Sequence, residues 1–396
     1  MRHYRCIICI LLLFTRVLSI QAALLPPTAV SKIPLFHIHA TSLYDAGFQL
    51  GKLASIQIQT WFQLAEFRAT ETFVQRSELG ARAFAALKQD NTAAFPELVE
   101  EMKGMADGAG VSLDQIWMAN LTPELESLQP STMQTERGHC TDIFGYEEDS
   151  ISNGIAPSSP SFLHGHNEDW SEVVKKLWYF VKITPLPSAN FDACSGMAYP
   201  GTLLGYAATW SKNIYSTQNT LFPRSTREDG GLACTFVQRR ATCGTPTSLD
   251  QSIEKLHTSD WAASASVNVV ALNSTQTTGM ANVEIYENDF NALLVSRTLG
   301  NYSHMNMFKH LKSGEDNDKG DNSTERRQQR VWQLDAPKSL DDMRRILGDI
   351  EGNYPIYRKI TLATLILTEK DHLLRVWIDA NPHDQIPDHI FNLSEY

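Results

Sequence analysis

The sequence of 396 residues has only one strongly apolar run, at residues 6–14 near its N-terminus. This run is shorter than the ~18 to 20 apolar residues that a membrane-spanning helix needs. Arg2 and Arg5 precede it and small residues around Ala22 follow it, which is the layout of a secretory signal peptide. We therefore expect residues 1–22 to be a signal peptide, with an uncleaved membrane anchor as the alternative for the same segment.

Positive charge is scarce relative to negative charge. The chain has 34 Lys and Arg residues against 45 Asp and Glu residues, a formal net charge of −11. Nucleic acids and anionic membrane surfaces are bound through basic patches, so the composition argues against both as main partners. No later segment is long and apolar enough for a membrane helix, so stable membrane insertion is not expected. The hydrophobic share of 42% is that of an ordinary globular protein.

Cysteine is also rare. The chain has six cysteines, and two of them lie in the expected signal peptide. The four that remain, Cys140, Cys194, Cys234 and Cys243, are too few for a disulfide scaffold. A bridge between Cys234 and Cys243 is plausible in an oxidising compartment, and it would leave Cys140 and Cys194 either paired or free.

Sequons for N-glycosylation agree with entry into the secretory pathway, and thus with a protein that is secreted or resides in the endolysosomal lumen. Such tripeptides also arise by chance, so they only corroborate the signal peptide. The five candidate sites are Asn120, Asn273, Asn301, Asn322 and Asn392.

The periodicity of apolar residues changes near residue 140. Residues 44–125 have the helical period, with Pro96 in a first turn and a capping box at Ser112 and Gln115. Further helices are predicted at 247–258 and 339–350. Strands rich in β-branched and aromatic residues are predicted at 140–146, 161–167, 176–184, 203–210, 232–239 and 266–273, with a last hairpin across 369–372. This order favours an α+β fold in which two sheets pack face to face with helices outside.

Cys140 is the candidate for chemistry, because it stands at the head of a predicted strand in GHCTDIFGY and is soon followed by HGHNEDW. It could be a buried structural thiol. It could bind a metal with His164, His166 and Asp169, but no second cysteine lies at ligand spacing, so we expect neither a metal nor another cofactor. It could also be a nucleophile that becomes a new N-terminus by self-cleavage, with its own α-amine as general base.

The two motifs resemble the cysteine N-terminal-nucleophile hydrolases of the acyl-CoA:isopenicillin N acyltransferase family, close to its branch of β-alanyl-amine hydrolases. The family hallmark is a Cys-Thr strand, a hairpin and a Gly-x-Asn-x-Asp turn, here completed by Asp169. The likeness extends in order over most of the mature chain. It includes the segments 44–58, 95–127, 216–223 and 302–308. The resemblance implies a four-layer αββα fold.

The resemblance also implies roles for individual residues. Cys140 would be the nucleophile, and the bond between His139 and Cys140 would be cleaved by the chain itself. Asp169 would be the carboxylate beside the new N-terminus. Asn219 would donate a hydrogen bond to the oxyanion that forms on the scissile carbonyl.

A further segment of the family, a Ser/Arg pair near the active site, resembles Ser323 and Arg326 at the start of STERRQQR. Arg327 could take the place of Arg326, and a solvated helix start is the alternative for the whole segment. We list Arg326 as the fourth candidate catalytic residue.

The function implied by the resemblance is that of a self-processing amidohydrolase. Its N-terminal chain, residues 23–139, and its catalytic chain, residues 140–396, would remain together as a heterodimer. It would cleave a linear amide of a small amine, such as carcinine or N-β-alanyl-dopamine, through a thioester on Cys140. An acyltransferase would use the same thioester. A fatty-amide hydrolase similar to acid ceramidase or N-acylethanolamine amidase is the next alternative, and a secreted binding protein without activity is the last.

Overall fold

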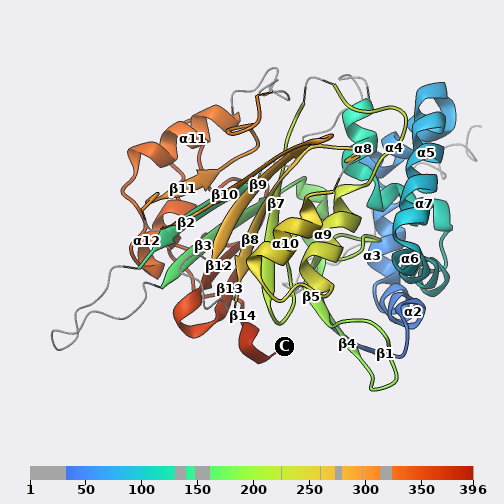
Figure 1. Cartoon of the computed structure of the whole chain (residues 1–396), viewed down its shortest axis with the longest axis horizontal. Helices are drawn as coiled ribbons and strands as arrows, with labels where there is room; N and C mark the ends of the chain where they lie inside the picture. The colour runs from blue at the N-terminus through green and yellow to red at the C-terminus, as the bar shows by residue number, and fades with distance from the viewer. Residues whose placement is uncertain are drawn as a thin grey trace, which may run out of the picture. The chain divides into compact units, whose positions relative to one another are not determined.

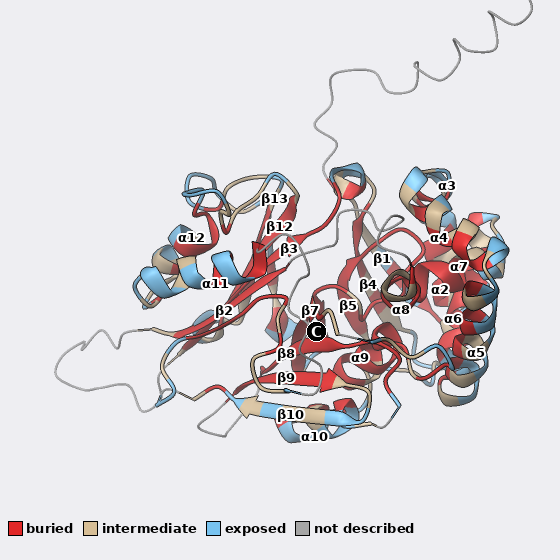
Figure 2. Cartoon of the chain, turned by 90° about the horizontal axis from the view of Figure 1, so that it is seen from above, coloured by how far each residue is buried: buried red, intermediate tan, exposed pale blue. Residues whose placement is uncertain are grey.

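The computed structural model describes residues 33–129, 140–147, 161–223, 225–258, 260–272, 279–296, 298–312 and 323–395. The expected signal peptide and His139 lie outside these ranges. Within them, no helix has both the length and the apolar character needed to cross a membrane. Figure 1 shows the course of the chain, and Figure 2 shows that the strands are largely buried while the helices expose their outer sides.

The first part of the described chain is a short strand, which the sequence did not indicate, followed by the helical layer that the periodicity predicts. Helices α2 and α6 pack backbone to backbone: a Cβ on Gly47 would lie 1.8 Å from the carbonyl oxygen of Glu101, and one on Gly104 would lie 2.0 Å from that of Tyr44. Only glycine permits this approach. The elements are β1 (Leu35–Ala40), α2 (Leu43–Leu53), α3 (Ser55–Trp61), α4 (Ala65–Arg76), α5 (Glu78–Ala94), α6 (Pro96–Ala109), α7 (Leu113–Asn120) and α8 (Thr122–Leu128).

The rest of the chain completes two sheets. Among the described residues, the larger sheet has eight strands in the order β1-β4-β5-β6-β7-β8-β9-β10, and β1 joins it parallel to β4. Its further strands are β4 (Tyr179–Pro185), β5 (Cys194–Ala198), β6 (Thr209–Trp210), β7 (Ile214–Thr220), β8 (Ala265–Ala271), β9 (Met280–Tyr286) and β10 (Asp289–Leu294).

The smaller sheet has six strands within the same residues, in the order β11-β2-β3-β12-β13-β14. All of its neighbouring strands are antiparallel, and the predicted last hairpin is the pair β12 and β13. The strands are β2 (Thr141–Tyr146), β3 (Phe162–Asp169), β11 (Tyr302–His304), β12 (Thr361–Thr368), β13 (Leu373–Ile378) and β14 (His389–Asn392).

Helices cover the outer face of each sheet. α9 (Cys234–Cys243) and α10 (Leu249–Leu256) contact β7 and β8 of the larger sheet, whereas α11 (Ser323–Gln333) and α12 (Leu340–Leu347) contact β11, β3 and β12 of the smaller one. A separate apolar cluster fills the space between α12 and the smaller sheet. The predicted α+β class and the four αββα layers are therefore confirmed.

Two predicted strands are wrong. Residues 232–239 were expected to form a strand, but Cys234–Cys243 is a helix that lies buried along most of its length, so an apolar run was mistaken for an extended one. In the stretch 203–210, only Thr209–Trp210 is extended, because the chain turns at Gly205, whose φ is +125°.

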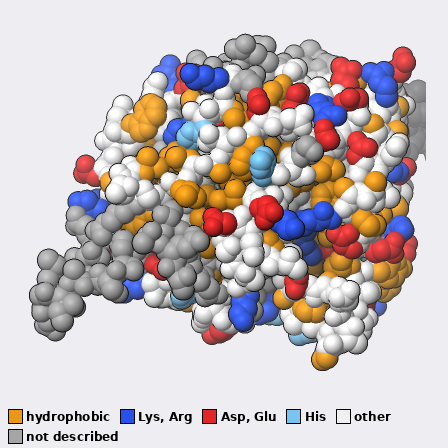
Figure 3. Space-filling view, in the orientation of Figure 1, with side chains coloured by type: hydrophobic (Ala, Val, Ile, Leu, Met, Phe, Trp, Pro, Cys, Tyr) orange, Lys and Arg blue, Asp and Glu red, His pale blue; other side chains and the backbone are white. Residues whose placement is uncertain are grey.

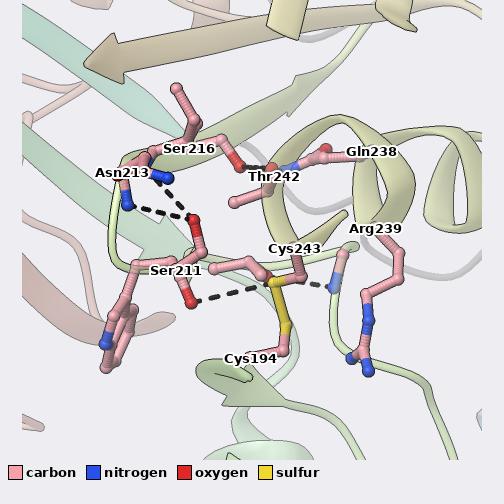
Figure 4. Close-up of a disulfide and its surroundings, with 12 residues drawn as sticks. Cys194, Ser211, Asn213, Ser216, Gln238, Arg239, Thr242 and Cys243 are labelled. Atoms are coloured by element: carbon pink, nitrogen blue, oxygen red, sulfur yellow. Dashed lines mark hydrogen bonds between the residues drawn. A yellow bond between two sulfur atoms is a disulfide. The ribbon is translucent and has the colours of Figure 1, made fainter. Parts of the chain in front are cut away.

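The disulfide also differs from the plausible Cys234–Cys243 bridge. Cys194 of β5 is bonded to Cys243 at the end of α9, with their Cα atoms 5.2 Å apart (Figure 4). Cys234 and Cys243 lie at opposite ends of one helix, about 14 Å apart at 1.5 Å per residue. That distance is about twice what a disulfide can span. Cys140 and Cys234 are buried free thiols.

The surface shown in Figure 3 carries a broken band of hydrophobic side chains, with acidic and basic side chains interspersed around it.

Candidate active site

The pairing of β2 with β3 places Cys140 opposite Glu168. Asp142 lies opposite His166 in this antiparallel pair, so the same register continued by two residues sets Cys140 across from Glu168. Residues opposite each other share a face of the sheet. On that face the Cys140 thiol donates to Oε1 of Glu168 over 3.5 Å.

This face points toward the larger sheet. The hydroxyl of Thr217, on β7, donates to Oδ1 of Asp142 at 2.6 Å, so the two sheets meet at the polar residues that follow Cys140. Cys140 itself is 6% exposed, and Glu168 is 5% exposed. The thiol is therefore enclosed between the sheets, with the Glu168 carboxylate as a hydrogen-bond acceptor.

A continuous series of hydrogen bonds runs behind Glu168. Tyr199 donates its hydroxyl to Oε1 of Glu168 at 2.6 Å, and Nε2 of His166 lies 3.2 Å from Oε2. Nδ1 of His166 lies 2.9 Å from Oδ2 of Asp142, and Nε2 of His164 lies 2.9 Å from Oδ1 of the same carboxylate. Each oxygen of the Asp142 carboxylate thus contacts one imidazole ring.

The charges of this network are set by burial and by each other. Burial lowers the pKa of His166, but Asp142, together with Cys140 and Glu168, outweighs burial and raises that pKa well above its usual value. Burial likewise opposes the ionisation of Asp142, yet the two histidines hold its pKa below the ordinary range. Burial, helped by the Glu168 carboxylate and opposed by His166, raises the pKa of the Cys140 thiol to about 12. The thiol is therefore protonated at neutral pH.

Asp169 lies on the opposite face of β3, as the period of two requires. It accepts hydrogen bonds from Nη2 of Arg358 at 2.8 Å and from the hydroxyl of Thr361. Asp169 is 1% exposed and also lines the pocket that contains Cys140. The structure thus brings Asp169 to the pocket of the Cys140 thiol, in a buried ion pair that the sequence did not indicate.

Arg327, and not the predicted Arg326, reaches Cys140. Its Nη1 donates to the backbone carbonyl of Cys140 at 2.9 Å and to the hydroxyl of Thr141 at 2.6 Å, and its side chain is fully buried. Arg326 instead lies over the ring of Tyr354. Side chains of adjacent helix residues point about 100° away from each other. A shift of one position along α11 therefore determines which guanidinium lies in the site.

Asn219 is buried near the C-terminal end of β7. Its Oδ1 accepts from Asn268 at 2.9 Å, while its Nδ2 has no hydrogen-bond partner among the described residues. The next residue, Thr220, is connected to Arg327 through Asn306. The Asn306 side chain donates to the Thr220 carbonyl and accepts from Arg327. A buried amide donor without a partner normally lowers stability. The Nδ2 of Asn219 is therefore well placed to donate a hydrogen bond to an acceptor that a bound substrate would supply.

A pocket of about 270 Å³ gives access to the thiol. Its lining combines polar residues with three aromatic side chains: Cys140, Glu168, Asp169, Gln218, Thr220, Trp170, Tyr199 and Tyr206. A second pocket, of about 540 Å³, shares Trp170, Tyr206 and Thr220 with the first and contains Glu126, Phe222 and Ala263 further out. The two together form a narrow inner part and a wider, more apolar outer part.

Three ligand-type side chains of the site could also hold a metal ion. Ligand atoms of Cys140, His166 and Glu168 all lie within 4.8 Å of one another. This set differs from the one considered from the sequence, because His164 and Asp169 are bonded to other partners. Cys140 and Glu168 of this set also line the pocket, so a metal would compete with a substrate for the thiol.

The sequons fall in different environments. Asn120 is fully buried, and its side-chain amide donates to the carbonyl of Gly201 and accepts from the amide of Leu203, so a glycan at Asn120 is incompatible with this fold. Asn301 is exposed and Asn392 is half-buried. Asn273 and Asn322 lie outside the described residues.

Several residues of the site were not singled out from the sequence. Glu168, Tyr199 and Arg358 each touch Cys140 or Asp169 or a direct partner of these. Glu168 could have been found from the strand period, since it shares a face with His164 and His166. Tyr199 and Arg358 come from distant segments and carried no signal in the sequence.

No protein-family model matches the chain. The chain is 24% identical over 348 residues to the beta-alanyl-dopamine/carcinine hydrolase of Drosophila melanogaster, a match that covers 83% of this chain and 86% of that protein. The predicted resemblance is confirmed. The same match supports the coarser prediction that the chain is an enzyme of the hydrolase class.

Among solved structures, the chain is similar to the Caenorhabditis elegans ortholog of N-acylethanolamine-hydrolyzing acid amidase. The match covers 58% of this chain and 93% of that one, at 12% sequence identity and a TM-score of 0.42. Such a score is too low to carry a conclusion about the chain.

Proposed function

We propose that the chain is a self-processing cysteine amidohydrolase that cleaves a linear amide of a small amine through a thioester on Cys140. The observation that carries the proposal is the placement of the Cys140 thiol at the inner end of a pocket, at the head of a central strand. The buried Nδ2 of Asn219, for which the described residues offer no hydrogen-bond partner, supports it. The similarity to a hydrolase over 83% of the chain agrees with it.

Self-processing would begin when the Cys140 sulfur attacks the carbonyl carbon of His139. The C–N bond breaks, the thiol proton goes to the released nitrogen, and a thioester joins His139 to the sulfur. Water then hydrolyses the thioester, which leaves a carboxylate on His139 and a free α-amine and thiol on Cys140. The products are the N-terminal chain 23–139 and the catalytic chain 140–396.

The contacts between these two parts support a stable heterodimer after cleavage. Arg239 forms a buried ion pair with Glu101, and the backbone amide of Cys234 donates to Glu124 at 2.9 Å. The backbone amide of Ala233 donates to Asn91 in the same interface. Each contact joins a residue of 33–129 to one of the catalytic chain.

In the processed enzyme the α-amine of Cys140 would be the general base, as its ordinary pKa of about 8 suits it to take a thiol proton near neutral pH. The thiolate attacks the amide carbonyl, and Asn219 donates to the oxyanion. The amine leaves with the proton from the α-ammonium, and water then releases the acid from the thioester. Asp169, held by Arg358, would hold the new N-terminus in place.

For the substrate we propose a β-alanyl amine such as carcinine or N-β-alanyl-dopamine, because the Drosophila relative bears that name. The inner pocket is small and lined by the rings of Trp170, Tyr199 and Tyr206, which favours a short acyl group over a fatty one. An acyltransferase using the same thioester is the alternative, and it differs only in whether an amine or water takes the acyl group.

We propose entry into the secretory pathway on the basis of residues 1–22, and an exposed sequon at Asn301 supports it.

The test is purification of the wild-type chain beside Cys140→Ala, with Cys234→Ala as the matched control because Cys234 is also a buried free thiol. Wild type and the control should give two fragments, one of which begins with Cys140 by N-terminal sequencing, and Cys140→Ala should stay intact. Turnover of carcinine with and without an added amine separates hydrolysis from transfer. A single intact band for the wild type would refute self-processing.

A further inference from the structure

We propose that the carboxylate of Glu168 binds a positively charged amino group on the acyl part of the substrate, and so selects short amino-acyl amides over fatty or uncharged ones. The inference rests on the proposed function, since it assigns the acyl specificity of the same site. It goes further by naming the residue that binds the acyl part and the charge of the group that this residue binds.

The position of Glu168 is the first argument. Its Oε1 lies 3.5 Å from the sulfur to which the acyl group would be attached. An ammonium two carbons from the acyl carbonyl, as in a β-alanyl group, can turn back to a carboxylate at this position. A long alkyl chain leaving the same sulfur would have to pass a buried carboxylate, which costs free energy without a compensating partner.

The charges around the pocket are the second argument. Asp142 is matched by His166, and Asp169 is paired with Arg358. In the described part of the chain, neither Lys nor Arg forms an ion pair with Glu168, whose polar contacts are the thiol, Tyr199 and His166. His166 forms an ion pair with Asp142 and also with Glu168, so the two carboxylates share one imidazole, and a cationic ligand can balance the remaining negative charge.

The fixed orientation of Glu168 is the third argument. The Tyr199 hydroxyl donates to Oε1 at 2.6 Å, and His166 contacts Oε2. Because both oxygens are held before a substrate binds, little side-chain entropy is lost on binding. A binding carboxylate needs such support, whereas a solvated one would bind an ammonium weakly.

The aromatic lining is the fourth argument. Trp170 and Tyr199 pack edge to face with ring centroids 4.4 Å apart, and Tyr206 packs against both rings. All three line the inner pocket with Glu168. Aromatic rings around a carboxylate are a favourable environment for an ammonium group. The wider outer pocket would take the amine part of the amide.

The experiment uses the full-length, self-processed enzyme and two substrates that differ in one group, carcinine and N-propanoyl-histamine. The second lacks only the amino group of the acyl part. We expect the wild type to prefer carcinine in kcat/KM by at least about 100-fold, since a site built around a polar contact rejects an analogue that lacks it. Glu168→Gln should reduce this preference to less than about tenfold by slowing carcinine.

Control variants separate the acyl contact from general damage. Glu172→Gln removes a carboxylate on the surface, 43% exposed and paired with Lys359, and should leave the preference unchanged. Glu168→Asp keeps the charge and should retain most of the preference. If Glu168→Gln is not processed or does not fold, the kcat/KM values of the wild type are compared on glycyl-, β-alanyl-, γ-aminobutyryl- and propanoyl-histamine. This comparison still tests whether the enzyme selects for the amino group of the acyl part.

The outcomes distinguish the two proposals. If the wild type hydrolyses no amide, the proposed function fails. If the wild type hydrolyses carcinine and N-propanoyl-histamine equally well, or if Glu168→Gln slows both by the same factor, the proposed function stands and the inference about Glu168 is overturned. A loss of preference in Glu168→Gln with a retained preference in Glu168→Asp supports the inference.

Discussion

Arg327 of α11 holds the backbone of Cys140: its guanidinium donates to the Cys140 carbonyl at 2.9 Å, from a helix nearly 190 residues further along the chain. The same guanidinium also donates to Asn306, whose side chain in turn contacts the end of β7. One buried cation thus fixes the head of β2 relative to the strand that carries Asn219.

Replacement of Arg327 by Met should therefore destabilise the fold and slow self-processing. It leaves the Cys140 carbonyl and the Asn306 side chain without their donor, and buried groups without a partner cost about 1–3 kcal/mol each. Arg326→Met, which lies one residue away, should change the free energy of unfolding by less than about 0.5 kcal/mol. Urea titration and the rate of fragment formation measure both effects. Equal effects of the two substitutions would contradict the assignment of Arg327.

Asn219→Ala should lower kcat about 10²- to 10³-fold with little change in KM. The reason is that its unpaired Nδ2 is proposed to donate only to the oxyanion, and loss of one such donor costs about 3 kcal/mol of transition-state stabilisation. Asn213→Ala, on the loop before β7, is the control and should keep wild-type kinetics. A rise in KM at constant kcat would instead indicate that Asn219 binds the ground state.

The His166–Asp142 pair should make stability depend on pH. The pKa of His166 is raised in the folded chain, so its contribution is complete below about pH 6.5 and is lost as the pH rises through the raised value. The pKa of Asp142 is lowered, so its contribution is present above about pH 4 and is lost as the pH falls further. In chemical denaturation from pH 5 to 9, the wild type should lose stability toward alkaline pH relative to His166→Gln. A constant difference across this range would rule out a charged His166.

Loss of the disulfide should destabilise the catalytic chain. The Cys194–Cys243 bridge closes a loop of 49 residues, for which the loop-entropy estimate is about 4 kcal/mol. We expect Cys194→Ser and Cys243→Ser to lower the thermal midpoint alike, and the double variant to lower it no further. Peptide mapping without reductant should recover the 194–243 pair, and a recovered 234–243 pair would contradict the structure.

Glycan occupancy should follow exposure. Asn301→Gln should remove one glycosidase-sensitive mass increment when the protein is made through the secretory pathway, since Asn301 is exposed. Asn120→Gln should remove none, but it should destabilise the chain because both amide atoms of Asn120 are bonded to the backbone at 201 and 203. Intact-mass measurement before and after deglycosylation decides both points.

The sequence predicts much of this fold, and the exceptions have physical causes. The strand that begins after Cys140 and the hairpin that follows are readable because turn residues and β-branched residues mark them. The helix Cys234–Cys243 is not, since its start carries the β-branched and aromatic residues 235–237, which are typical of a strand.

The residues of the site also differ in whether they could be predicted from the sequence. Cys140, Asp169 and Asn219 could be named from local motifs, and the structure brings Cys140 and Asp169 to one pocket. Glu168 and Asp169 are neighbours in sequence but lie on opposite faces of β3, and only the register with β2 shows which of them faces the thiol. The choice between Arg326 and Arg327 depends on the rotation of α11, which the helix start alone does not fix.

The position of the cysteines has a consequence for how the molecule is held together. Residues 23–139 contain no cysteine, and the disulfide closes entirely within the catalytic chain. Cleavage as proposed would leave two polypeptides joined only by non-covalent contacts that formed while they were one chain. Unfolding would then release two partners that must meet again at their dilute concentration. The lifetime of such a protein depends on a slow rate of unfolding more than on a favourable folding equilibrium. Once denatured, it would not regain its activity.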